Sequence, residues 1–474
     1  MIRVTKEQID AAAPNAAAIK NAHEIVQKGQ IVQLYCSDEE TLVFGECKGS
    51  GSSNYRPSAD FVHPDSPVYR CTCPSRQFPC KHVLALLYAY LQSPDCPVAP
   101  IPQDIFDKRE KVAQREQKKT DASATQAPKK VNKGALAKKL QAQLEGLSSL
   151  EDILLQITKA GLATQDGQAL RLLEERSKQL ANHYLTGAQI QLRKLILSLR
   201  QESIEQVYRD AYGQLTVLYS LVKRGKDHLS KRLADPDLAL NTDSAIEEWL
   251  GHAWQIGELR EYGLVQQNAE LVQLAFHSYE DAARQEYVDL GLWMNLATGE
   301  IHETYTYRPY RAIQHIREDD SVFSVAHVSE LFLYPGDINR RIRWEQASLR
   351  DIREPDYALI RSKAHHLYAD VIKAVKNQIK NPLAHKHPAF LLSFQRMAAA
   401  GDDYVLIDGQ DHRLLLKSED SRFPDTLHLI RLLPIELLRN QVLLVTFTHN
   451  QATNQLTAHP LTFCTEKQLV RLAY

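Results

Sequence analysis

Four residues between positions 71 and 82 constrain this chain more than any other feature of its sequence. Cys71, Cys73, Cys80 and His82 follow the spacing C-x-C-x6-C-x-H. Three thiols and one imidazole are the kind and number of ligands that a structural zinc ion takes in a tetrahedral site. Side chains two residues apart in an extended strand point to the same face, so both thiols of the C-x-C pair can reach one ion. We therefore predict one zinc ion on these four residues.

The residues between the ligands favour the same arrangement. Pro74 and Pro79 restrain the six-residue turn, and Cys80 and His82 are expected at the start of the following helix. Four protein ligands leave no open coordination position, so the predicted zinc is structural and not catalytic. It would stabilise a module too short to build a sufficient core. The alternative is three buried cysteines beside a surface histidine.

This spacing resembles that of the SWIM zinc fingers. Together with the string from Gly45 to Arg56, the string from Cys71 to Leu86 looks like the bacterial SWIM zinc finger family proteins, and the resemblance covers residues 12–95. It implies a ββα zinc module that binds DNA or protein. Bacterial relatives are often linked to MoxR-type AAA ATPases and von Willebrand A-domain proteins. The resemblance therefore implies a component of a chaperone-like or regulatory assembly.

Residues 1–106 are expected to form this zinc module together with an N-terminal helix and strands. A helix follows Pro14, and Gly29 ends it. Alternation of apolar residues and turn signals predict further elements. These are strands at Ile31–Cys36, Thr41–Cys47, Ala59–Val62 and Val68–Cys73, and a helix from about Cys80 to Leu91.

Residues 107–140 differ in composition from the rest of the chain. They hold eleven basic and four acidic residues, a net charge of +7, and have no apolar periodicity. Such a segment is typical of a flexible Lys-rich linker. Its lysines could bind nucleic acid through counterion release, but a soluble tether is the preferred interpretation.

The remaining chain is predicted to hold two further regions. Residues 141–286 are expected to be helical, including a helix across Val265–Ala283. Residues 287–474 are expected to form an α+β domain with an antiparallel sheet and one helix at about Asp356–Ile379. The predicted fold class is therefore α+β multidomain, with a small zinc module, a basic linker, a helical middle region and a C-terminal antiparallel domain.

Composition excludes several classes of protein. The chain of 474 residues has a net charge of −1, which argues against a dedicated whole-chain nucleic-acid binder. No apolar run is long enough for a membrane span, and the N-terminus lacks an apolar signal core. The seven cysteines indicate a metal site plus isolated thiols, not a disulfide framework. We therefore expect a cytoplasmic protein that does not contact a membrane.

Other candidate sites carry weaker signals. His385 and His387 could chelate a metal if they lie on a strand, but the flanking prolines favour a loop. His365 and His366 are expected on a helix, where neighbouring side chains diverge. The best basic and aromatic cluster outside the linker could contact phosphate or an acidic partner, although a surface edge strand explains it equally well. It consists of Arg340, Arg341, Arg343 and Trp344.

Two functions are compatible with these features. The first is an intracellular protein-interaction adaptor in which the tethered zinc module recruits a protein partner. The alternative is a DNA-binding or other nucleic-acid-binding protein that uses the zinc module and the basic linker. The sequence holds no recognisable catalytic constellation, so we expect the chain not to be an enzyme.

Overall fold

A computed structural model of the chain divides it into two units, Met1–Lys130 and Val131–Tyr474. The two units are described separately. The predicted linker falls largely outside the described residues. The structure describes residues 4–13, 16–49, 53–62, 67–73, 75, 79–93, 96–103, 105, 106, 109, 132–200, 204–312 and 319–473.

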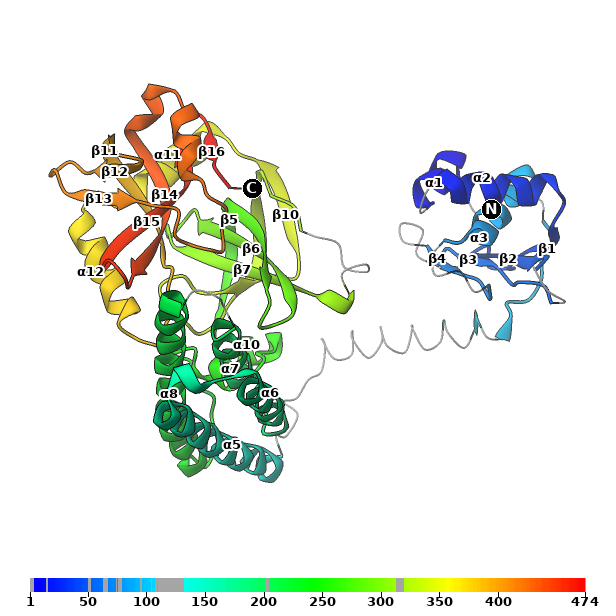
Figure 1. Ribbon diagram of the computed structural model, residues 1–474. Coiled ribbons are helices and arrows are strands. Elements are labelled where there is room, and N and C mark those ends of the chain that lie inside the picture. The colour runs from blue at the N-terminus through cyan, green and yellow to red at the C-terminus, as the bar shows by residue number, and fades with distance from the viewer. Residues whose placement is uncertain are drawn as a thin grey trace. The chain divides into compact units, whose positions relative to one another are not determined.

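The smaller unit is an antiparallel sheet of four strands with helices on one face (Figure 1). The strands follow one another in the order β1-β2-β3-β4. Each strand therefore pairs with its neighbour in the sequence. The elements are α1 (Lys6–Ala12), α2 (Ala16–Gln27), β1 (Ile31–Cys36), β2 (Leu42–Cys47), β3 (Ser58–Asp60), β4 (Val68–Arg70) and α3 (Lys81–Gln92).

Local sequence signals explain the ends of the first two helices. Thr5 and Gln8 form a capping box, in which each side chain accepts a hydrogen bond from the other residue's backbone N–H. Helix α2 gives way to a turn in which Gly29 has φ of 58°, a conformation that glycine adopts without strain. The helix predicted after Pro14 is confirmed.

Cysteine pairing in the smaller unit differs from the prediction. Cys36 and Cys96 are joined by a disulfide, with their Cα atoms 6.0 Å apart. The expectation that both are isolated thiols is therefore wrong. The two residues are 60 positions apart, and only the fold brings the end of β1 next to the chain that leaves α3.

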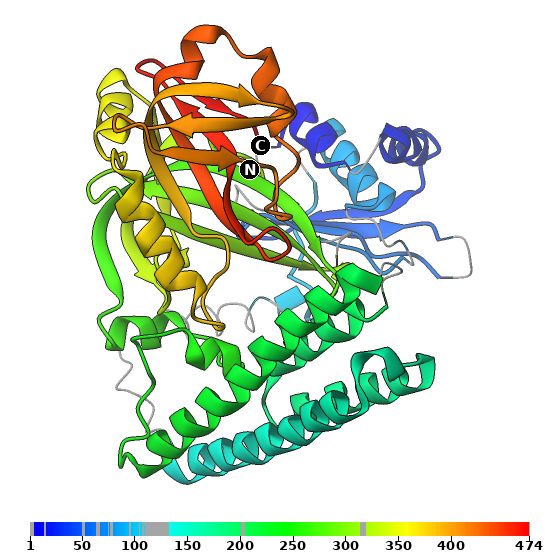
Figure 2. The ribbon, with the colours of Figure 1, turned by 60° about the vertical axis from the view of Figure 1, so that its left-hand side comes forward.

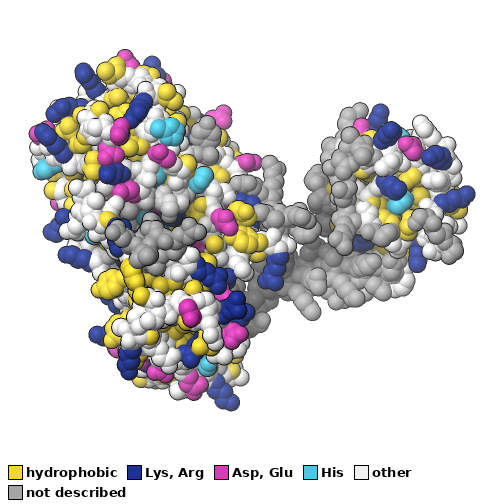
Figure 3. Space-filling model, in the orientation of Figure 1, with side chains coloured by type: hydrophobic (Ala, Val, Ile, Leu, Met, Phe, Trp, Pro, Cys, Tyr) yellow, Lys and Arg dark blue, Asp and Glu magenta, His cyan; other side chains and the backbone are white. Residues whose placement is uncertain are grey.

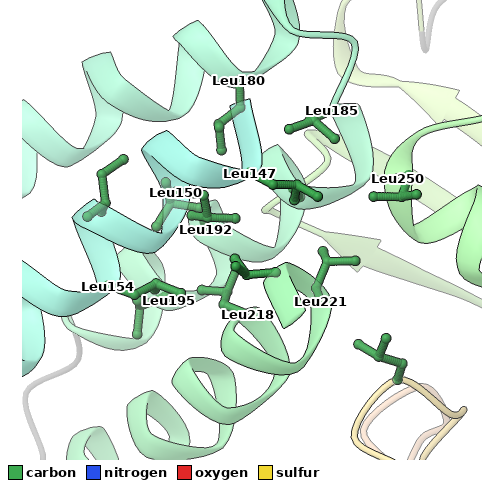
Figure 4. Packing of buried hydrophobic residues seen from close by; sticks show 14 of the residues in the cluster. Leu147, Leu150, Leu154, Leu180, Leu185, Leu192, Leu195, Leu218, Leu221 and Leu250 are labelled. Carbon is green, nitrogen blue, oxygen red and sulfur yellow. The ribbon is translucent and has the colours of Figure 1, made fainter. Parts of the chain in front are cut away.

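The larger unit begins with a set of helices. The two longest, α5 and α8, lie side by side (Figure 2). Leucines from α5, α7 and α8 interdigitate in one apolar core (Figure 4). The helices are α5 (Lys133–Ala160), α6 (Gly167–Asn182), α7 (Thr186–Ser198), α8 (Ile204–Ala234), α9 (Ile246–Leu250) and α10 (Ile256–Glu261).

Two six-stranded sheets follow these helices. The first has the order β10-β8-β5-β6-β7, with β9 paired to β8, and the second has the order β13-β12-β11-β14-β15-β16. The first sheet comprises β5 (Val265–Asp281), β6 (Glu286–Asn295), β7 (Ile301–Pro309), β8 (Ser324–Leu333), β9 (Ile342–Arg343) and β10 (Ala347–Asp351). The second comprises β11 (Ala389–Ala400), β12 (Asp403–Ile407), β13 (Arg413–Leu416), β14 (Arg439–Asn450), β15 (Gln455–Cys464) and β16 (Leu469–Arg471).

The two sheets share a buried apolar core. Leu274 and Leu292 of the first sheet belong to the same cluster as Leu444 and Leu461 of the second. The hydroxyl of Thr462 also donates a hydrogen bond of 2.6 Å to the carbonyl of Leu274. This packing, together with the helices and the zinc module, confirms the α+β multidomain fold class.

The helix predicted across Val265–Ala283 is wrong, because this segment forms strand β5. Its middle residues are buried on both faces. Leu274 faces the core between the sheets, while Leu271 belongs to a separate cluster with Trp293 and Val328. A strand buried on both faces lacks the alternation of apolar and polar residues that marks a half-buried strand.

Two further boundaries differ from the prediction. Helix α5 begins at Lys133, with Asn132 as its cap, so residues 133–140 are helical and not part of a flexible linker. The single helix expected at Asp356–Ile379 is two helices, α11 (Glu354–Ser362) and α12 (Tyr368–Ile379). His365 lies between them, not on a helix, since its backbone pairs with β11 through Leu391 and Ser393.

Within the described part of the chain, none of the helices is both long enough and apolar enough to cross a membrane. The visible face of the larger unit carries interspersed acidic and basic side chains (Figure 3). That face therefore presents no electrostatic field of a single sign, which agrees with the near-neutral net charge of the chain.

Candidate metal centre

The four predicted ligands come from the end of a hairpin and the start of a helix. Strand β4 ends at Arg70, and Cys71 and Cys73 follow in a bend. The predicted strand through Cys73 is therefore too long, but the pair still faces the helix. Cys80 caps α3, and His82 lies in its first turn. The sheet and the helix together bring both halves of the motif to one point.

The ligand atoms of Cys71, Cys73, Cys80 and His82 all lie within 4.8 Å of one another. Cys80 Sγ and His82 Nδ1 are 3.8 Å apart. Cys73, Cys80 and His82 are buried, and Cys71 is partly exposed. Among the described residues this is the one Cys, His, Asp or Glu group close enough to hold a metal ion. Its chemistry and closeness are compatible with one structural zinc.

The charge state of the thiols favours a bound cation. Hydrogen bonds from Cys71, from His82 and from the N–H of Val83 lower the pKa of Cys80 to about 4, against the effect of burial. The hydrogen bond to Cys80 and burial raise the pKa of Cys71, and burial raises that of Cys73. These hydrogen bonds favour the thiolate form of Cys80. Ionising its neighbours is opposed by burial and charge repulsion, which a divalent ion would offset.

Neighbouring residues support the positions of the ligands. The ring of Tyr55 lies 4.8 Å from that of His82, and its backbone pairs with Cys47 at the end of β2. Thr72 turns away from the site, as its position between two ligands requires, and its hydroxyl accepts a hydrogen bond of 2.9 Å from the N–H of Arg56. The metal centre is therefore held from the adjacent strand as well as from its own hairpin.

The hairpin, the helix and the Cys and His cluster define a zinc-finger module. Residues 61–91 match the family model of the SWIM zinc finger, and this span contains all four ligands. The resemblance predicted from the spacing is confirmed. No curated protein matches the chain, and no solved structure does either.

The other sequence candidates take part in intramolecular contacts. His385 and His387 lie in a loop, as the flanking prolines predicted. Nε2 of His385 lies 3.0 Å from Arg422 Nη1, and Nδ1 of His387 lies 3.0 Å from the hydroxyl of Thr448. Each imidazole is therefore engaged with the surrounding protein rather than with a shared metal position.

The basic and aromatic cluster also faces inward in part. Arg341 stacks over the ring of Tyr334 at 4.4 Å and forms an ion pair of 3.7 Å with Glu248. Trp344 packs edge to face against Trp293. These contacts join the residues on either side of β9 to α9 and the first sheet, so they account for Arg341 and Trp344 without an external ligand.

Sequence reasoning missed a buried charge network in the larger unit. Arg422 is hydrogen-bonded to Asp420, to Glu303 on β7 and to His385. The spacing Asp420-x-Arg422 is a local signal for an ion pair, but nothing in the sequence points to Glu303. All five N–H groups of Arg422 have partners, the fifth being donated to the carbonyl of His387, so the network is structural.

Proposed function

We propose that the chain is a zinc-stabilised adaptor. One structural zinc on Cys71, Cys73, Cys80 and His82 holds a SWIM-type module that binds a protein partner. The observation that carries this proposal is the closed set of four protein ligands, because such a set leaves no coordination position for a substrate. The zinc then shapes a surface and takes no part in a reaction.

Exposed apolar residues on the zinc module support a protein partner. Val62 follows β3 and Val68 begins β4, and their exposed fractions are 47% and 46%. Residues 1–106 hold nine basic and eleven acidic residues, so the module itself is slightly acidic. A phosphate backbone favours a basic surface, whereas a protein interface favours apolar residues near its centre.

The test is a pull-down of the tagged full chain from its native lysate, with and without nuclease. We expect a defined protein that survives nuclease treatment and is lost with Cys80→Ser. Cys464→Ser is the matched control, because Cys464 is a buried free cysteine of the larger unit. Val68→Asp should reduce capture while zinc content stays unchanged. If the Cys80→Ser variant still captures the same protein, the assignment of the interface to this module is refuted. The SWIM resemblance implies MoxR-type AAA ATPases and von Willebrand A-domain proteins as partners, so these are the first proteins to look for among those captured.

The second candidate function is nucleic-acid binding through the zinc module and the basic segment 107–140, whose net charge of +7 favours it. Residues 110–131, the central part of that segment, lie outside the described residues. Salt separates the two proposals. Binding that depends on several lysine contacts to phosphate should fall by orders of magnitude between about 50 and 200 mM salt. Binding through an apolar interface should change little over this range.

A further inference from the structure

One end of the sheet of the zinc module, around Leu42 and Asp60, is buried on the face that its helices do not cover. Val43 packs against Leu86 and Tyr90 of α3, so its neighbour Leu42 must point to the opposite face. Leu42 is nevertheless fully buried, and its cross-strand partner Asp60 is 4% exposed. In a two-layer module this outer face would lie in water. Another segment must therefore cover it.

The chain that follows α3 returns to this sheet. The N–H of Cys36 donates to the carbonyl of Pro97, and the N–H of Ala99 donates to the carbonyl of Cys36. These two bonds place the returning segment beside β1 as a short parallel extension of the sheet. Ile105 further along is 5% exposed, whereas its neighbour Phe106 is half exposed. The segment therefore has one side packed against protein.

Arg109 ties the far end of this segment to the outer face. Its guanidinium donates to both carboxylate oxygens of Asp60, at 2.8 and 3.1 Å, and to the carbonyl and hydroxyl of Thr41. A second ion pair of 3.4 Å reaches Glu39. Burial alone would raise the pKa of Asp60, but the hydrogen bonds from Arg109 hold that pKa below its usual value. Asp60 therefore stays ionised and keeps this end attached.

The disulfide between Cys36 and Cys96 fixes the near end covalently to the last residue of β1, on the side that packs against Val43 and α3. The two ends thus differ in kind, since one is held by ion pairs and the other by a bond that thiol chemistry can open. We propose that the described residues between Cys96 and Arg109 belong to a redox-controlled strap that runs from the edge of the zinc-module sheet at β1 to its outer face at Asp60. Reduction frees its near end and makes the face around Leu42 accessible.

The redox step balances with an external dithiol as the reductant. The bond between the two sulfurs breaks, and each sulfur takes up one electron and one proton. The dithiol loses the same two electrons and two protons and becomes a disulfide. The zinc ligands take no part, because neither Cys36 nor Cys96 belongs to the metal cluster. Opening of the strap is therefore independent of zinc binding and of the protein partner proposed above.

Hydrogen exchange on the full zinc-loaded chain tests the strap. Non-reducing peptide mapping should first show the peptide that links Cys36 to Cys96. After reduction with a phosphine that removes the disulfide, we expect the amides of Cys36 and Ala99 to exchange about tenfold faster or more. The amides of α3 should be unaffected, and zinc content should remain at one ion per chain. Cys36→Ser should reproduce the reduced state without any reductant.

Two control variants distinguish release of the strap from a general loss of structure. Arg109→Gln should speed exchange at Ile105 and Phe106 while the amide of Ala99 stays protected in the oxidised chain. Cys464→Ser should leave all of these amides unchanged. The proposal is overturned if Cys36 and Cys96 both remain open to alkylation in the oxidised protein. It is also overturned if reduction leaves exchange at Ala99 unchanged.

Discussion

The guanidinium of Arg422 donates a hydrogen bond of 3.1 Å to the carboxylate of Glu303, which lies 119 positions earlier in the chain. Glu303 belongs to β7 of the first sheet, and Arg422 lies between β13 and β14 of the second sheet. Asp420 holds the other side of the same guanidinium. The buried guanidinium of Arg422 therefore links the two sheets. It is the charge partner of two buried carboxylates, those of Glu303 and Asp420.

Loss of this cation should be costly for stability. Arg422→Met leaves Glu303 and Asp420 buried without their partner, and breaking a buried pair in this way costs about 3–5 kcal/mol. The free energy of unfolding from denaturant titration measures the effect. Arg431→Met is the matched control, because Arg431 forms an exposed pair with Asp402 and should change stability by less than about 0.5 kcal/mol. A loss below about 1 kcal/mol for Arg422→Met would contradict the assignment.

Stability should fall as pH is lowered from about 6.5 toward 4. Burial lowers the pKa of His387 to about 4, against the attraction of Asp420. Its unfolded pKa is about 6.5, so the folded state favours the neutral ring. This contribution is complete above pH 6.5 and is lost as pH falls toward the folded pKa, at most about 3 kcal/mol. Burial lowers the pKa of His385 in the same direction.

His387→Gln should flatten this acid-side slope, because glutamine does not titrate. Urea unfolding at several pH values between 7 and 4 measures it. His428→Gln is the control, since the side chain of His428 is 61% exposed. If the slope of His387→Gln equals that of the wild type, this histidine is not a source of the pH dependence.

Purified wild-type chain should carry one zinc ion, and Cys80→Ser should carry close to none. Loss of the ion removes folding free energy from the module, so the amides of Val83 and Leu84, which donate to the carbonyl of Cys80, should lose protection from exchange. Elemental analysis and hydrogen exchange measure the two effects. Wild-type chain prepared without chelators that contains no zinc would refute the site. Cys464→Ser should retain the ion.

The helical core should be sensitive to cavities at Leu147. This residue is fully buried among leucines of α5, α7 and α8 (Figure 4). Leu147→Ala should lower the free energy of unfolding by about 2–5 kcal/mol, from lost burial and the cavity left behind. Leu155→Ala on the same helix should have a small effect, since Leu155 is 46% exposed. Similar losses for both variants would contradict the packing.

The metal centre could be predicted because its information is local. Cys71 and His82 are eleven positions apart, and the ligand types, their spacing and the following helix are all visible in that stretch. The helix after Pro14 and the strand at Ile31–Cys36 were predictable for the same reason, since caps, turns and periodicity act over a few residues. The sequence by itself therefore determined the zinc ligands and the elements around them.

Tertiary structure decided the features that depend on distant segments. Strand β5 is buried between two layers, so its sequence lacks the alternation that would mark it as a strand. The pairing of Cys36 with Cys96 and of Glu303 with Arg422 depends on where the sheets place these side chains. No local pattern encodes such contacts, because they form only when strands far apart in the sequence are packed together.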